Sequence, residues 1–179
     1  LAGLPVDTSK VLLGNRFFMP NQAGYQDNSG DWSYDVEAAK KLLDDAGWVE
    51  GSDGIREKDG QRLSVSFTLP AGTPTTENEA TLLQSQVKEI GMEIKLNSVD
   101  SNGYFKDYIN TGNFELTAFP WQGTQSPMAN IGQIYGTGSN QNYSGISVPE
   151  IDEYIQKVAT TADQEERFKL TNECDALIW

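Results

Sequence analysis

The 179-residue sequence has no histidine, a single cysteine, and only 13 lysine and arginine residues against 26 aspartate and glutamate residues. Without histidine the chain lacks the commonest metal ligand and the commonest general base, and no Ser-His-Asp triad can form. The formal net charge of −13 argues against nucleic acid, whose phosphates require basic side chains, and against a basic membrane-binding surface. We therefore predict no nucleic-acid partner, no metal site, no cofactor and no catalysis that relies on histidine.

Cysteine and long apolar runs are equally scarce. Cys174 has no partner for an internal disulfide, and it falls on the apolar stripe of the last expected helix, so we expect a buried thiol. No apolar run approaches the roughly 20 residues that span a bilayer, and residues 1–20 lack the pattern of a secretory signal. The length and composition indicate one compact α/β domain whose acidic surface aids solubility.

A well-marked helix is predicted between Asp35 and Gly47. The Asp35 carboxylate can accept hydrogen bonds from the first turn, and Gly47 supplies the left-handed residue that ends many helices. Apolar residues at helical spacing give this helix one face that we expect to be buried: Val36, Ala39, Leu42, Leu43 and Ala46.

A hairpin and a sheet are predicted after this helix. The Asp59-Gly60 pair is a strong turn signal. Further along, three predicted strands alternate with two helices, the first opened by a capping box of Thr76 and Glu79 and the second by Ser101. Such crossovers make neighbouring strands parallel. The predicted fold class is α/β, an open and mostly parallel sheet with helices on both faces, from strands 63–69, 93–99 and 114–121.

The rest of the chain is expected to be less regular. Residues 1–32 are predicted to form an irregular lead-in with short extended segments, and residues 33–179 to form the α/β lobe. A short helix is expected near 128–135, and two further helices follow, opened by capping boxes at Ser147 and Asp163.

A ligand site is predicted where the third strand ends, because ligands bind beyond the carboxyl ends of strands in open parallel sheets. Phe119 and Trp121 offer aromatic area there, and Gln122 and Thr124 offer hydrogen-bonding groups. The alternative is that the two aromatic residues belong to the core of a buried strand. Two residues of the following loop, Asn142 and Tyr143, complete the candidate ligand-binding set, with simple solvent exposure as their alternative.

The order and spacing of several segments resemble the solute-binding proteins of bacterial peptide-type ABC importers, the family of oligopeptide, dipeptide and nickel binders. The helix before Trp48 matches the family pattern except that Val36 replaces the usual proline. The resemblance implies a lobe of the periplasmic binding protein type II kind. We expect the chain to be a truncated C-terminal lobe of a longer, two-lobed protein. The remaining segments that carry the resemblance are 54–60, 63–69, 86–94, 112–116, 142–144 and 149–152.

The resemblance also implies a function. The whole protein is expected to be a binding protein and not an enzyme. As a monomer, it would capture a peptide or other small polar solute between two lobes and deliver it to the transmembrane subunits of an ABC permease. Its expected place is the extracellular face of the membrane, held by a lipid anchor, or the periplasm. Many relatives carry an aspartate that binds a peptide amino group where this chain has Thr124. A carbohydrate-active enzyme or carbohydrate-binding accessory module, working through its many carboxylates, and a plain interaction domain remain as alternatives.

Overall fold

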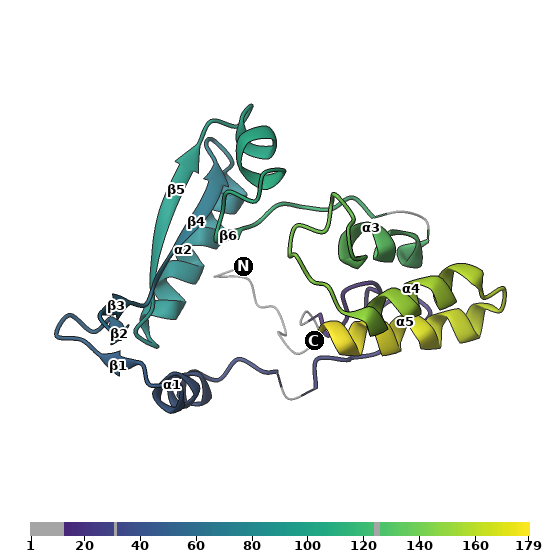
Figure 1. The fold of residues 1–179 in the computed structure, drawn as a ribbon, viewed down its shortest axis with the longest axis horizontal. Coiled ribbons are helices and arrows are strands. Elements are labelled where there is room, and N and C mark those ends of the chain that lie inside the picture. Colours follow the sequence, from purple (N-terminus) through teal and green to yellow (C-terminus); the bar gives the residue numbers. More distant parts are fainter. Residues whose placement is uncertain (1–12, 31, 124–125) are drawn as a thin grey trace. The chain divides into compact units, whose positions relative to one another are not determined.

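The computed structural model (Figure 1) describes residues 13–30, 32–123 and 126–179. In this part of the chain no helix has both the length and the apolar character that are needed to cross a membrane.

The chain divides into two compact units. One unit is Tyr34–Trp121, and the other combines Leu1–Ser33 with Gln122–Trp179. This division differs from the predicted limits of a lead-in over 1–32 and a lobe over 33–179, which stay a prediction for the complete protein.

The unit Tyr34–Trp121 is built on a three-stranded parallel sheet in the order β5-β4-β6. The central strand β4, Ser64–Pro70, pairs in parallel with β5, Glu93–Val99, and with β6, Leu116–Thr117. The third strand is therefore much shorter than predicted. The Glu115 carboxylate accepts the Ser66 N–H at 2.6 Å and so takes the donor that a longer β6 would pair with.

Helices cover both faces of this sheet. On one face α2, Pro74–Lys88, packs through Ala80 against Phe67 and its neighbours in the hydrophobic core (Figure 1). On the other face lies a π-helical turn, η2, Tyr104–Ile109, whose Tyr104 hydroxyl bonds to the Thr117 side chain. Because side chains alternate along a strand, Thr117 points away from the face that carries Phe67 and Leu116. The predicted α/β class is confirmed.

Helix α1, Val36–Asp45, and the hairpin after it form as predicted. The Ala38 N–H donates to Asp35 at 2.9 Å, and Gly47 has a φ of +84°. The strands β1, Val49–Glu50, β2, Arg56–Lys58, and β3, Gln61–Arg62, form a small antiparallel sheet. Both residues of the Asp59-Gly60 turn have positive φ. The expected buried face of α1 is wrong, because none of the helix residues is buried.

Two of the predicted capping boxes are also wrong. Helix α2 begins at Pro74, two residues before Thr76, whose side chain is buried. Helix α4, Pro149–Thr160, begins without any side-chain cap. In both helices a proline occupies the first turn, where its fixed φ favours the helix and its missing N–H needs no partner.

The other unit is helical in its described part. It contains η3, Pro127–Asn130, α3, Ile131–Tyr135, α4, and α5, Gln164–Ile178. The Asp163 side chain caps α5 as predicted, accepting the Glu166 N–H at 2.8 Å. Its core joins the early segment to these helices through Phe18, Met128, Ile131, Ile151, Val158 and Cys174.

The thiol of Cys174 is buried, as predicted. Burial raises the pKa of Cys174 to about 11. We expect a maleimide to label this thiol at pH 8 at least roughly 100-fold more slowly in the native protein than in urea, since the thiolate reacts and each pKa unit is a factor of ten. Mass spectrometry of timed samples measures the two rates, and equal rates would show that the thiol is accessible.

Candidate functional site

Four aromatic side chains form a row beyond the carboxyl ends of strands β5 and β6. Tyr104 and Phe105 follow β5, and Phe119 and Trp121 follow β6. Their ring centroids are separated in turn by 5.2 Å, 5.2 Å and 5.9 Å, the first two contacts being edge-to-face. Such contacts add about 0.5–1.5 kcal/mol each to the burial of the rings. We call these four residues the aromatic row.

The inner end of the aromatic row is fixed to the sheet. Tyr104 is buried, and its hydroxyl bonds to Thr117 and reaches the Ala118 carbonyl oxygen at 3.3 Å. The Thr117 hydroxyl in turn donates to the Thr68 carbonyl oxygen at 2.9 Å. Burial raises the pKa of the Tyr104 phenol, so it remains a neutral hydrogen-bonding group. These bonds connect the row to strands β4 and β6.

The outer end of the aromatic row is open to solvent. Phe105 is 45% exposed and Trp121 is 41% exposed, and Phe119 lies half-buried in contact with both. No side chain of the row carries a charge at neutral pH. Rings held in this way offer apolar area to a ligand at a small cost in conformational entropy.

Phe105 is a member of the row that the sequence did not predict. It lies in η2, where the Asn110 N–H donates to the Phe105 carbonyl oxygen at 2.9 Å in the pattern of a π-helix. This wider turn changes which side chains face the sheet. The strand-end rule that selected Phe119 applies equally to an aromatic residue after β5, and it was the signal that would have found Phe105.

The structure brings two of the predicted site residues together, Phe119 and Trp121, and neither lies deep in the core. Gln122 is exposed and belongs to the other unit. Thr124 lies outside the described residues. Ligand contacts by these four residues stay predictions.

Asn142 and Tyr143 also belong to the other unit. The Asn142 amide donates to the Ile146 carbonyl oxygen at 2.7 Å and to Gly136 at 3.2 Å, and its oxygen accepts from Ser144 at 2.8 Å. These bonds hold the loop in shape. Tyr143 is half-buried. The predicted role of both residues in ligand binding remains a prediction.

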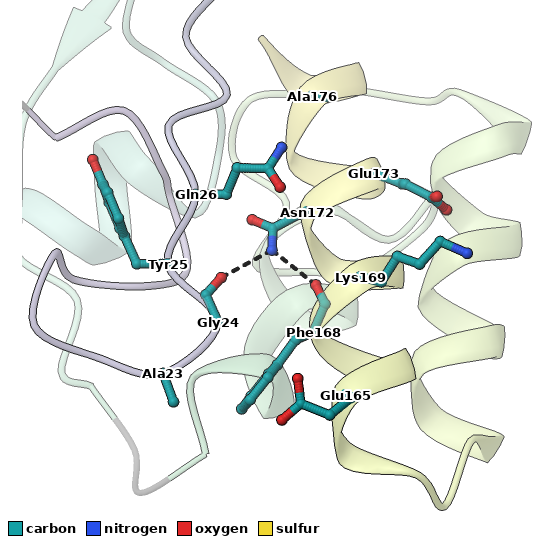
Figure 2. Close-up of a pocket in the computed structure, with 10 residues that line it drawn as sticks. All are labelled: Ala23, Gly24, Tyr25, Gln26, Glu165, Phe168, Lys169, Asn172, Glu173 and Ala176. Atoms are coloured by element: carbon teal, nitrogen blue, oxygen red, sulfur yellow. Dashed lines mark hydrogen bonds between the residues drawn. The ribbon is translucent and has the colours of Figure 1, made fainter.

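A pocket of about 560 Å³ lies in the helical unit, between residues 23–26 and α5 (Figure 2). The Asn172 amide donates to the carbonyl oxygens of Gly24 and Phe168, both at 2.9 Å, and its own oxygen accepts from two other asparagines. The polar groups of Asn172 are thus paired within the protein, and the other polar side chains that line the pocket are Gln26, Glu165, Lys169 and Glu173. The pocket lies where residues 23–26 pack against α5.

Within the described residues, no group of three or more His, Cys, Asp or Glu side chains is placed to hold a metal ion.

The sequence over residues 11–143 matches the family model described as "Bacterial extracellular solute-binding proteins, family 5 Middle". This match covers more than half of the chain. The chain belongs to the bacterial extracellular solute-binding proteins of family 5. The predicted resemblance to binding proteins of peptide-type importers is confirmed.

Known members of family 5 agree with this assignment. The oligopeptide-binding protein OppA of Mycobacterium bovis is 36% identical over 169 residues, which are 94% of this chain and 28% of OppA. The chain thus spans less than a third of that relative. The relatives that we name are described as binding proteins and none as an enzyme, so the carbohydrate alternative receives no support.

Solved structures show the same fold. The periplasmic EDTA-binding protein EppA has a TM-score of 0.78 and 31% identity, over 93% of this chain and 32% of EppA. AppA from Bacillus subtilis, solved with a nonapeptide, has a TM-score of 0.74 and 24% identity, over 89% of this chain and 33% of AppA.

Proposed function

We propose that the complete protein is the substrate-binding component of an ABC importer. It captures a peptide or another small polar solute and delivers it to a membrane permease, without making or breaking bonds. Membership of family 5 and the similarity to OppA along nearly the whole chain support this proposal. In it, the protein acts as a monomer, either anchored by a lipid on the outer face of the membrane or free in the periplasm.

The aromatic row forms one wall of the proposed solute site. The observation that carries this assignment is that the exposed rings of Phe105 and Trp121 lie beyond the carboxyl ends of parallel strands, where ligands bind in open sheets. Gln122, Thr124, Asn142 and Tyr143 supply polar groups in this proposal. A second lobe closes over the solute by a hinge motion.

The proposed solute does not depend on a charged amine clamp at Thr124. A charged hydrogen bond contributes about 1.5–3 kcal/mol, and threonine cannot supply one to an ammonium group. A peptide whose amino end is blocked, or held elsewhere, fits the site, and so does another polar solute with an apolar face. Native mass spectrometry of the full-length protein, purified without denaturation, identifies the solute that it carries.

The Trp121→Ala substitution is expected to weaken binding of that solute by about 10- to 100-fold, or ~1.4–2.8 kcal/mol, because exposed aromatic anchors are typical binding hot spots. Trp121→Phe should lose less affinity for the solute, since phenylalanine keeps an aromatic ring. Isothermal titration calorimetry on the full-length protein measures the affinities. Trp32→Ala is the matched control, because this indole is 68% exposed in the other unit. Unchanged affinity of Trp121→Ala would remove the aromatic row from the site.

A further inference from the structure

The turn between β5 and η2 contains Asn102-Gly103, the only Asn-Gly pair in the sequence. Asparagine followed by glycine deamidates more readily than other asparagines, because glycine has no Cβ to hinder ring closure. The Gly103 backbone nitrogen loses its proton and attacks the side-chain Cγ of Asn102. Ammonia leaves, a succinimide forms, and water opens the ring to aspartate or isoaspartate. Asn102 is exposed, so water has access to this pair.

Asp100 binds the N–H group that this reaction must deprotonate. The Gly103 N–H donates both to the Asp100 carbonyl oxygen, at 3.1 Å, and to the Asp100 Oδ1 atom, at 3.2 Å. The same Oδ1 atom accepts the Asn102 N–H at 3.0 Å, which is the bond of an Asx turn. The Asp100 charge also opposes loss of the Gly103 proton, since a negative group disfavours a second negative charge beside it. Both effects slow the attack on Asn102.

Gly103 is held on its carbonyl side as well. Its carbonyl oxygen accepts the Asp107 N–H at 2.8 Å, and its backbone has helical angles, with φ −85° and ψ −17°. A carboxylate oxygen of Asp107 lies 2.8 Å from the position that a Cβ atom on Gly103 would take. A larger residue would therefore displace this carboxylate. The packing of the turn thus favours the glycine that makes Asn102 reactive.

We propose that Asn102 is a latent deamidation site and that Asp100 protects it in the folded protein. Isoaspartate at this position would add a methylene group to the main chain and a negative charge next to Asp100. Tyr104 and Phe105, the first two rings of the aromatic row, follow the Asn102-Gly103 pair directly. Protection of Asn102 therefore preserves the backbone that positions these two rings. This protection does not depend on the solute that the protein binds.

Timed incubation of the full-length protein at mildly alkaline pH tests this proposal. Mass spectrometry follows the deamidated fraction of the peptide that carries Asn102. We expect Asp100→Ala to deamidate at least roughly tenfold faster than the unchanged protein, because a hydrogen bond to a charged group contributes more than the ~1.4 kcal/mol of a tenfold change. Asp100→Ser should show an intermediate rate, since its hydroxyl accepts such bonds more weakly. Asp100→Ala combined with Asn102→Gln should show almost no deamidation, because glutamine closes a larger ring more slowly.

Ser101→Ala is the control for a general loosening of the turn. The Ser101 hydroxyl donates to the Ala71 carbonyl oxygen at 2.6 Å, and its removal leaves both Asp100 bonds to Gly103 in place. A similar acceleration in Ser101→Ala, or equal rates in Asp100→Ala and the unchanged protein, would overturn the proposal. If Asp100→Ala does not fold, Asp100→Ser takes its place. A faster rate than in both the unchanged protein and Ser101→Ala then supports the proposal, and no increase contradicts it.

Discussion

Replacing Asn15 by alanine is expected to lower the free energy of unfolding of its unit by about 3 kcal/mol, because each buried polar group left unpaired costs about 1–3 kcal/mol. Asn15 is buried, and its oxygen accepts the N–H groups of Phe17 and Phe18 at 2.9 Å and 2.8 Å. Its amide donates to the Gln26 carbonyl oxygen at 3.0 Å and to Asn172 at 2.8 Å. Alanine removes the amide oxygen, which accepts two hydrogen bonds, and the amide nitrogen, which donates two.

The measurement is urea unfolding followed by far-UV circular dichroism. Asn140→Ala is the control, because Asn140 is an exposed asparagine of the same unit and surface substitutions usually change stability by less than about 0.5 kcal/mol. Similar unfolding midpoints for the two variants would mean that the buried bonds of Asn15 contribute little.

Replacing Arg56 by methionine is expected to destabilise the other unit by about 3 kcal/mol, because two partly buried carbonyl acceptors lose their donors. The Arg56 side chain is buried and donates to the Ile90 carbonyl oxygen at 2.9 Å and to Trp48 at 2.8 Å. Its third partner, Asp44, is 63% exposed, so this ion pair contributes little of the loss. The methionine stem fills much of the same space but offers no donor.

Arg62→Met is the matched control for Arg56→Met. Arg62 also pairs with acidic side chains, Asp53 at 2.6 Å and Glu93 at 3.4 Å, but it is partly exposed. Exposed ion pairs contribute about 0–1 kcal/mol. Chemical unfolding with Trp fluorescence compares the variants, and an equal loss in both would show that burial of Arg56 is not what matters.

Short-range signals in the sequence predicted the local structure well. The caps at Asp35 and Asp163 and the Asp59-Gly60 turn form as expected, because each depends on hydrogen bonds or backbone angles within a few residues. The capping boxes at Thr76 and Ser147 did not form. In each case a nearby proline lies in the first turn and the helix begins at another residue. The sequence alone did not show whether the capping box or the proline would set the start of the helix.

The candidate site was predicted in part. Phe119 and Trp121 are two residues apart after a strand, and that spacing alone places their side chains on one side of an extended chain. Phe105 was missed because its position depends on a π-helical turn. The late start of β6, at Leu116 and not at residue 114, was missed because Glu115 bonds to Ser66, 49 residues away in the sequence.

The sequence by itself determined the family, the alternation of strands and helices, and the turns and caps of single segments, because these depend on residues close together in the chain. The tertiary structure decided the burial that local patterns did not predict. It left Leu42 of α1 exposed, buried Arg56 and Asn15 in hydrogen-bond networks, and joined four rings into the aromatic row. Burial and ring contacts depend on partners that are distant in sequence, and these partners come together only in the folded chain.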